Sequence, residues 1–457
     1  MKATASKDKL PIGVACQLGL VFAGQGLLSL LVLGVMNRIM IDEQLLAVPA
    51  LVATACLSVR FFVSPLRIYL GQLTDSRPLL GSQRTGYIRV SLPLACGFLM
   101  LALQAMWQLG GDDFWLWAVV LGALFGLYGI SLYMVSVAGL ALIHDITPED
   151  QRSQVMGVVW SMLLLGVVAG AIAGPVMLKG VDKDNLRPGI DEFFLLMCLS
   201  VLLLGYLGTW GVERRFSRRA ERVGSRTAEY VGFFQAIRIF ISSRQSVRFF
   251  VYLSILTLGI FMQQPVLEPF GGEVFAMTIG ETTRLNAFSF GATLFALIAT
   301  GFTLTPWLGP WHTTRIGLLV CALGFLGIVG SGLLGPDGSI PFYIAISVMG
   351  LGAGISTNSM LGIMLSLAPP ERAGLFLGTF GMAQYLSQAG ALLLAGVIVD
   401  LGRYVLDSVN AGYSLVFVAE AIILLGCIGL LGPLERGSAG AESRAPSVTE
   451  MLGESVD

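Results

Sequence analysis

The sequence has little charge. Asp, Glu, Lys and Arg together make up 12% of its 457 residues, whereas 55% of the residues are hydrophobic. A soluble protein carries about a quarter of its residues as charged ones. The shortage excludes an ordinary soluble protein, because lipid has to cover most of the surface. The composition therefore predicts a polytopic membrane protein.

The residues of common catalytic and metal sites are scarce as well. There are two histidines, His144 and His312, and six widely spaced cysteines without a C-x-x-C pair. We expect the cysteines to be buried free thiols rather than metal ligands or disulfides. No phosphate loop, zinc site or nucleophile triad is recognisable, so neither an enzyme nor a metal site is expected. The polar start, MKATASKDKL, predicts no cleavable signal peptide.

Long apolar stretches are what the sequence has in abundance. A helix needs about 20 apolar residues to cross roughly 30 Å of hydrocarbon. By this measure we expect 12 transmembrane helices, at 17–41, 47–70, 89–109, 115–143, 154–177, 193–211, 248–270, 285–306, 315–334, 340–367, 374–399 and 411–434. They divide into an N-terminal six-helix bundle at 1–211 and a C-terminal six-helix bundle at 248–434, with a basic cytoplasmic linker at 212–247. The small, polar tail at 435–457 is predicted to be disordered and cytoplasmic.

Lys and Arg predict the orientation. When the N-terminus is placed in the cytoplasm, the cytoplasmic segments contain most of the 28 basic residues. This asymmetry predicts that both termini are cytoplasmic. The arginine-rich linker raises the question of a nucleic-acid partner, but anionic lipid headgroups are the expected partner of such a segment in a membrane protein.

The two halves resemble each other. HDITPEDQRSQVMG follows the fourth span and SLAPPERAGLFLG follows the tenth, each with proline, acid and arginine before a glycine-rich helix. Two six-helix repeats around a basic central loop are typical of the major facilitator fold. The loop GQLTDSRPLLGSQR resembles that superfamily's G-x-L-x-D motif through Gly71 and Asp75. Of the basic residues that follow the aspartate in the motif, only Arg77 and Arg84 are present here. We therefore expect an all-α integral membrane protein of this fold, in two pseudo-symmetric halves.

Ionisable side chains inside a span are costly and mark either function or internal pairing. Arg38 lies about 20 residues, or roughly 30 Å, along the first span, and Glu268 lies at nearly the same depth in the seventh. In this fold the two spans face each other across the cavity, so we hypothesise that Arg38 and Glu268 pair or lie close at its outer mouth. The alternative is that Arg38 reaches the headgroups and Glu268 lies in a loop.

Other polar groups within the spans are further candidates. Arg60 lies near the middle of the second span, and Glu420 lies about eight residues into the twelfth. Each is satisfied either by an internal ion pair or backbone hydrogen bonds, or by a ligand. For Asn37 and Gln264, hydrogen bonds between helices are the default, with a ligand contact as the alternative.

Three stretches carry a resemblance to a known family. QQPVLEPFGGEVFAMTIGETTRL, at 263–285, closely resembles the PucC/LhaA family, the bacteriochlorophyll-delivery branch of the major facilitator superfamily. LGVMNRIMIDE, at 33–43, and FFVSPLRIYLGQLTDSRPLLGSQRTGYI, at 61–88, resemble further segments of that family. The resemblance covers essentially the whole chain and is closer to the cyanobacterial branch than to the purple-bacterial one.

The resemblance implies an assembly factor for light-harvesting or photosystem complexes in the photosynthetic membrane of a bacterium. Its cargo would be chlorophyll or bacteriochlorophyll, delivered to membrane apoproteins, with chlorophyll-synthesis enzymes as further partners. Two alternatives remain open. One is a secondary transporter of an amphipathic small molecule, as is common in this fold. The other is a pigment-free scaffold for apoproteins and pigment-synthesis enzymes.

A chlorophyll magnesium accepts one axial ligand, which in this chain would be Glu268, Glu420, Asn37, a glutamine or water. Glu268 is the preferred candidate because it lies in an unusual segment, LEPFGGEV. Pro265 and Pro269 interrupt helical hydrogen bonds, and the Gly271–Gly272 pair permits an open turn that would expose backbone carbonyls and the carboxylate. The alternative is an ordinary helix stop.

Overall fold

The computed structural model describes residues 10–148, 151–181, 185–213, 215, 244–367 and 373–442. In these ranges the chain is helical, with one isolated bridge and no strand. The first half contains α1 (Ile12–Leu30), η1 (Leu31–Met36), α2 (Asn37–Ile41), α3 (Ala50–Phe62), α4 (Leu66–Ser76), α5 (Thr85–Trp107), η2 (Gln108–Gly110), α6 (Phe114–Ile146), α7 (Arg152–Met177) and α8 (Leu186–Thr209). The second half contains α11 (Arg244–Phe261), α12 (Leu267–Phe275), α13 (Ile279–Phe302), α14 (Leu304–Gly332), η5 (Gly335–Gly338), α15 (Ser339–Leu367), α16 (Ala373–Leu406) and α17 (Val409–Glu442).

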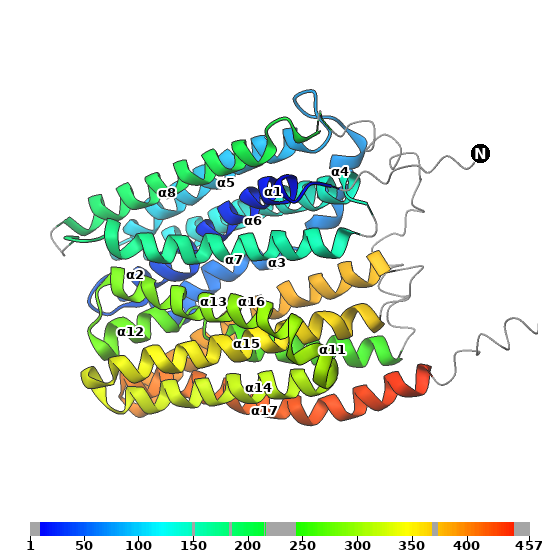
Figure 1. The fold of residues 1–457 in the computed structure, drawn as a ribbon. Coiled ribbons are helices and arrows are strands. Elements are labelled where there is room, and N and C mark those ends of the chain that lie inside the picture. The colour runs from blue at the N-terminus through cyan, green and yellow to red at the C-terminus, as the bar shows by residue number, and fades with distance from the viewer. Residues whose placement is uncertain are drawn as a thin grey trace, which may run out of the picture.

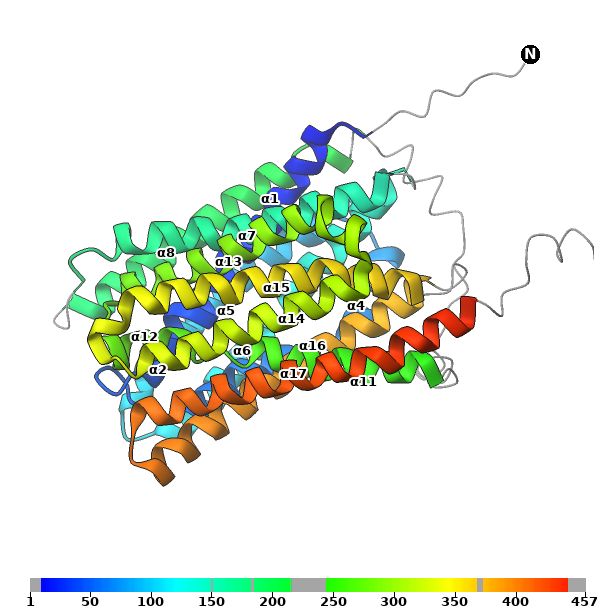
Figure 2. The same cartoon turned by 60° about the horizontal axis from the view of Figure 1, so that its bottom comes forward.

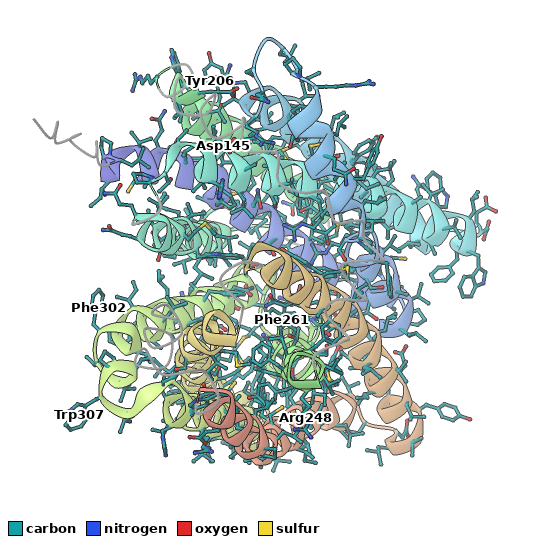
Figure 3. All side chains as sticks on the ribbon, turned by 90° about the vertical axis from the view of Figure 1, so that its right-hand side faces the viewer. Asp145, Tyr206, Arg248, Phe261, Phe302 and Trp307 are labelled. Atoms are coloured by element: carbon teal, nitrogen blue, oxygen red, sulfur yellow. The ribbon has the colours of Figure 1, made fainter. Side chains whose placement is uncertain are left out.

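The helices have the length and composition of membrane spans. Within the described residues, 10 helices are long and apolar enough to cross a membrane, and two shorter apolar helices, Ala50–Phe62 and Val247–Phe261, lie at the predicted second and seventh spans. Large apolar side chains such as Phe302 and Trp307 are exposed and point away from the bundle (Figure 3). The protein is therefore a multi-pass membrane protein.

Three of the predicted spans are interrupted helices. The first contains the π-helical segment η1 between α1 and α2. The second breaks between α3 and α4, where Pro65 lacks the N–H that would bond to the carbonyl of Phe61. The seventh breaks between α11 and α12, over residues 262–266. Such interruptions are tolerated where the freed backbone groups are buried within the protein.

The helices pack as two bundles (Figure 1). In the first bundle, α1 packs against α7 and α8, and α6 against α3 and α5. In the second, α15 packs against α13 and α14, and α17 against α11, α14 and α16. The bundles meet where α7 packs against α13, α3 against α16, and α2 against α12. Figures 1 and 2 both place α2 beside α12 at one end of the molecule, which we call the α12 end.

Glycines bring the two bundles close together at the α12 end. A Cβ added at Gly174 of α7 would lie 2.7 Å from the Thr283 side chain of α13. A Cβ added at Gly396 of α16 would lie 2.2 Å from the Thr54 hydroxyl of α3. Small residues at such positions let helices approach closely. The two halves are therefore tightly closed at this end.

The chain boundaries need one correction. The tail was predicted to be disordered from residue 435, but α17 continues to Glu442, so residues 435–442 are helical. Arg315 of α14 forms an ion pair with Glu435 of α17 at 2.5 Å, which fixes the helix beyond its apolar part. Most of the predicted linker, 216–243, and the tail from 443 onward lie outside the described residues.

Candidate functional site between the two halves

LEPFGGEV forms most of helix α12 and is not the open turn that its glycines predicted. Pro269 fits because it lies in the first turn, where a backbone N–H would have no helical partner. Phe270 anchors the helix in the second bundle, with its ring centroid 5.4 Å from that of Phe342 and 5.3 Å from that of Phe417. The interruption of the span lies just before α12, around Pro265.

The proline pair creates a hydrogen-bond acceptor that the other half uses. In a continuous helix the carbonyl of Pro265 would accept the N–H of residue 269, but Pro269 has none. Asn37 of α2 supplies the missing donor, with its Nδ2 atom 2.6 Å from the Pro265 oxygen in a buried contact. The broken span is thus completed by a side chain from the first half.

Arg38 makes a second buried connection between the halves. Its side chain donates to the carbonyls of Met277 at 2.5 Å and Thr278 at 2.6 Å, and to the hydroxyl of Thr282. α12 is followed by Ala276, whose backbone is left-handed and caps the helix. Met277 and Thr278 come next, in the short connection to α13. Arg38 is 4% exposed, so it does not reach the headgroups.

Gly272 makes room for the Arg38 guanidinium. A Cβ added at Gly272 would lie 2.5 Å from Nη2 and 2.8 Å from Cζ of Arg38. No side chain larger than hydrogen fits there without displacing the guanidinium. The second glycine of LEPFGGEV is therefore explained by this close approach, and its conformation is an ordinary helical one.

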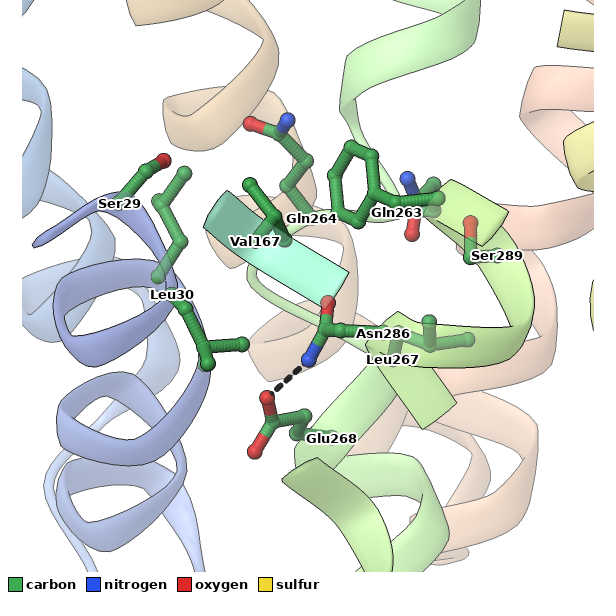
Figure 4. A pocket seen from close by; sticks show the side chains of 12 residues that line it. Ser29, Leu30, Val167, Gln263, Gln264, Leu267, Glu268, Asn286 and Ser289 are labelled. Atoms are coloured by element: carbon green, nitrogen blue, oxygen red, sulfur yellow. Dashed lines mark hydrogen bonds between the residues drawn. The ribbon is translucent and has the colours of Figure 1, made fainter. Parts of the chain in front are cut away.

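Glu268 is also buried at the interface and faces η1 and α13. Its Oε1 atom accepts a hydrogen bond from Asn286 at 2.5 Å (Figure 4), and its Oε2 atom lies 3.5 Å from the Thr282 hydroxyl. A Cβ added at Gly34 of η1 would lie 2.1 Å from Oε1, so this glycine admits the carboxylate. Glu268 is 1% exposed and does not lie in a loop.

Arg38 and Glu268 lie close to each other without forming a direct pair, because Thr282 lies between them. Both side chains approach its hydroxyl, so they are neighbours. The carboxylate within ion-pair distance of Arg38 is instead Asp42, 3.5 Å away on the next turn. In the described residues the two halves are therefore joined here by hydrogen bonds to neutral groups.

Glu420 lies at the break in the seventh span. Its Oε1 atom accepts the backbone N–H of Gln263 at 2.6 Å, while Oε2 has no hydrogen-bond partner in the described part of the chain. The Oε1 atom of the neighbouring Gln264 is likewise buried and without a partner there. The break thus leaves two buried oxygen atoms with free hydrogen-bonding capacity.

A central cavity adjoins these groups (Figure 4). It is lined by Ser29, Leu30, Leu33, Gly34, Val167, Gln263, Gln264, Leu267, Glu268, Asn286, Ser289 and Phe290. It offers about 20 Å³ to the centres of water molecules, which is room for one or two waters. In this conformation it is too small for an organic ligand.

A cluster around Arg403 also joins the halves, and it lies nearer to the α12 end than the central cavity does. The sequence analysis did not predict this cluster. Arg403 of α16 bonds to Glu43 at 3.1 Å, to the hydroxyl of Tyr413 at 2.5 Å and to Glu273. Tyr413 in turn donates to Glu273 at 2.9 Å. Glu43 and Glu273 both lie in the stretches that carry the family resemblance, which was the available signal.

The remaining candidates lie away from the central cavity. Arg60 lies among aromatic side chains between α3 and α6, where no described Asp or Glu is within ion-pair distance. Gly71 lies within α4, at the end of the molecule opposite α12. There Arg84 bonds to Asp145 of α6 at 3.1 Å and to Thr74 of α4 at 2.6 Å, tying α4, α5 and α6 together. The side chain of Asp75 lies outside the described residues.

Comparison with known proteins adds the family. The family model described as "PUCC protein" matches residues 35–439. The chain belongs to the PucC family. "Protein PucC" of Cereibacter sphaeroides is 29% identical over 450 residues, covering 96% of this chain and 95% of that protein. The "Bacteriochlorophyll synthase 44.5 kDa chain" of Rhodobacter capsulatus is 27% identical over 454 residues, covering 96% of this chain and 98% of that protein.

Solved structures resemble this PucC-family protein in fold. A mutant of the nucleoside transporter NupG superposes with a TM-score of 0.69 at 12% identity, covering 92% of this chain and 99% of that one. A bacterial homologue of the lysosomal transporter Spinster, in an inward-facing conformation, gives 0.66 at 14% identity, covering 96% of this chain and 99% of that one. The expected major facilitator fold is confirmed.

The geometry relates two of the family-like stretches to each other. Asn37 and Arg38 come from 33–43, and their partners Pro265, Met277 and Thr278 come from 263–285. In this PucC-family protein the two stretches therefore form one structural unit, in which the first half supplies the hydrogen-bond donors and the second half supplies the carbonyl acceptors.

Proposed function

We propose that this protein binds chlorophyll or bacteriochlorophyll between its two halves and helps deliver it to light-harvesting or photosystem apoproteins. Membership of the PucC family and the bacteriochlorophyll-related name of one relative support this proposal. The observation that carries it is the central cavity, where the stretches 33–43 and 263–285 meet and the buried Oε1 atom of Gln264 has no partner in the described part of the chain.

The chemistry of the lining fits a pigment. A chlorophyll is mostly apolar and needs a few polar anchors, one of them an oxygen or nitrogen ligand to magnesium. Glu268 is a poor ligand in this conformation because both of its oxygen atoms face hydrogen-bond donors. Gln264 has a buried oxygen without a described partner and lines the cavity. We therefore propose Gln264 rather than Glu268 as the axial ligand.

Binding requires the halves to separate. The cavity of about 20 Å³ admits one or two waters and no macrocycle. Rocking of one six-helix half against the other is the common motion of this fold and would enlarge a cavity at their interface. The tight contacts at the α12 end favour opening from the opposite end.

The remaining features of the proposal follow from the sequence and the relatives. The distribution of Lys and Arg favours cytoplasmic termini, with the α12 end on the outer side of a photosynthetic membrane. Apoproteins and chlorophyll-synthesis enzymes are the proposed partners, in addition to membrane lipid. We propose that the chain handles pigment without acting as an enzyme, although one relative is named as a synthase chain.

A secondary transporter of an amphipathic small molecule is the second candidate. The likeness in fold to a nucleoside transporter favours it, but fold alone carries little information on the substrate. A pigment-free scaffold for apoproteins and pigment-synthesis enzymes is the third candidate.

An absorption spectrum with pigment extraction tests the proposal, on protein purified gently from a phototrophic host. We expect a stoichiometric chlorophyll-type band in the wild type that is lost or shifted in Gln264→Leu. Gln108→Leu is the matched control, because Gln108 is exposed and does not line the cavity. A pigment-free wild type that co-purifies with apoproteins would favour the scaffold, and one without pigment or partners would favour the transporter.

A further inference from the structure

A second cluster of buried polar groups lies outside the central cavity, around Arg60 of α3. Arg60 is 5% exposed, and its Nε atom has no hydrogen-bond partner among the described residues. Tyr128 of α6 lies beside the guanidinium, with its hydroxyl directed to it. No described Asp or Glu forms an ion pair with this buried cation, and a buried cation without a carboxylate is costly, so the structure should contain a reason for keeping it.

The position of Arg60 is fixed by close packing. A Cβ added at Gly129 of α6 would lie 2.9 Å from the Cα, Cβ and carbonyl oxygen of Arg60. The backbone of α6 therefore presses directly on α3 at this residue. The guanidinium lies 4.5 Å from the ring centroid of Phe61, an aromatic contact that supplies no hydrogen-bond acceptor lone pair.

A second arginine adjoins the same aromatic rings. The Arg67 guanidinium lies 5.0 Å from the ring of Tyr133 and 4.6 Å from the ring of Tyr385. The Tyr385 ring centroid is 5.5 Å from that of Tyr133 and 6.2 Å from that of Phe61. Tyr385 belongs to α16, whereas the other residues belong to the first half. The Arg60 cluster (Arg60, Phe61, Arg67, Tyr128, Tyr133 and Tyr385) therefore spans the interface between the halves.

The chemistry of this cluster selects a carboxylate. No Asp or Glu of the described residues forms an ion pair with Arg60 or Arg67. A guanidinium matches the planar geometry of a carboxylate with two parallel hydrogen bonds. Three aromatic rings beside the cations offer a surface for an apolar or aromatic body. Because Tyr385 comes from the second half, separation of the halves would remove its ring from the Arg67 guanidinium and from the Phe61 ring.

We propose that Arg60 and Arg67 bind the carboxylate of an amphipathic ligand whose apolar or aromatic body packs on Phe61, Tyr133 and Tyr385. This proposal rests on the proposed function and adds to it a second site, outside the central cavity, which takes the free acid of a pigment rather than its ester. Two sources share that chemistry: a tetrapyrrole pigment with a free carboxyl group and a fatty acid of the membrane.

The test is a binding titration of the full chain in detergent with three probes: chlorophyllide, its methyl ester and oleate. Pigment fluorescence reports the first two, and oleate is measured by competition and by direct isotope binding. We expect the wild type to bind chlorophyllide at least about 10-fold more tightly than the methyl ester, since hydrogen bonds to charged groups are the strong ones. Arg60→Gln should weaken chlorophyllide binding by about 10- to 100-fold and leave ester binding almost unchanged. Arg67→Gln should weaken it by about 2- to 5-fold, because Arg67 is partly exposed.

Arg89→Gln is the matched control. Arg89 also stacks on a tyrosine, with its guanidinium 5.2 Å from the ring of Tyr206, but it bonds to Thr209 and lies outside the Arg60 cluster. We expect it to bind all three probes as the wild type does. Loss of acid binding in Arg89→Gln would overturn the assignment to Arg60. The loss in Arg60→Gln would then be explained by a general effect of removing any arginine.

The outcomes separate this proposal from the proposed function. Equal binding of acid and ester in the wild type, or an unchanged acid preference in Arg60→Gln, overturns the carboxylate site while pigment binding stands. Binding of oleate that depends on Arg60, without binding of either pigment, supports the site and tells against the pigment. If Arg60→Gln does not fold, the acid-to-ester ratio of Arg67→Gln decides, and an unchanged ratio overturns the proposal.

Discussion

Replacing Gly272 by alanine tests the contact between the halves most directly. The substitution places a Cβ 2.5 Å from Nη2 and 2.8 Å from Nε of Arg38, well inside van der Waals contact. An exposed arginine would swing away at little cost. Arg38 is 4% exposed and bonds to three groups, so it cannot move without losing at least the bond from Nη2 to the Met277 carbonyl.

The expected magnitude combines two opposing effects. A hydrogen bond to a charged group contributes about 1.5–3 kcal/mol, and disrupting a buried charged contact as a whole costs about 3–5 kcal/mol. Alanine is favoured over glycine inside a helix by about 1 kcal/mol, and Gly272 has a helical conformation. We therefore expect Gly272→Ala to lower the free energy of unfolding by about 0.5–4 kcal/mol.

The assay is thermal unfolding in detergent, with Gly97→Ala as the matched control. Gly97 lies inside α5, and a Cβ added there would meet no atom within 4 Å. The control should melt at or above the wild-type temperature, and Gly272→Ala should melt below it. A Gly272→Ala protein as stable as Gly97→Ala would refute the idea that the Arg38 guanidinium requires this glycine.

Three further perturbations test the interface. The double exchange Arg38→Glu with Glu268→Arg should not restore the stability lost in either single variant, because the two meet through Thr282; recovery of the wild-type melting temperature would show a direct pair. Glu420→Gln should have a free energy of unfolding within about 1 kcal/mol of the wild-type value, because glutamine keeps the acceptor for the Gln263 N–H. Glu420→Ala should lower the free energy of unfolding by about 1–3 kcal/mol. Equal melting temperatures of the two variants would contradict this role of Glu420. Arg403→Gln should speed hydrogen exchange at 267–275 relative to Arg187→Gln, a surface control, and unchanged exchange would mean that the Arg403 cluster does not hold α12.

The fold was predictable because its signal is local. The length of an apolar stretch and the placement of Lys and Arg report on membrane spans without knowledge of neighbours. The break in the second span was missed although Pro65 marks it, because hydropathy averages over a proline within an apolar run. The end of α17 was missed for a different reason. Glu435 is polar, as in a disordered tail, and its partner Arg315 is 120 residues away in sequence.

The candidate site was predictable only in part. The depth of Arg38 and Glu268 along their helices correctly placed them near each other, since the rise per residue is fixed. Their partners could not be predicted, because the acceptors are backbone carbonyls and a threonine of no distinctive pattern. The glycines of LEPFGGEV were misread for the same reason. A glycine that makes room for a distant guanidinium has the same sequence signature as one that ends a helix.

Among the described residues, several buried hydrogen-bonding groups near the interface between the halves have no partner, which favours a ligand that joins the halves. Near the α12 end, Asn37 and Arg38 bond across the interface, whereas Glu268 bonds to Asn286 and Thr282 of its own half. Asn37 Oδ1, Gln264 Oε1 and Arg60 Nε are buried without hydrogen-bond partners in the described part of the chain. Each such group costs about 1–3 kcal/mol in the empty protein. A ligand that supplies a partner recovers this free energy only in the conformation that admits it, and so shifts the equilibrium toward that conformation. Binding and opening are therefore coupled through the same few buried atoms.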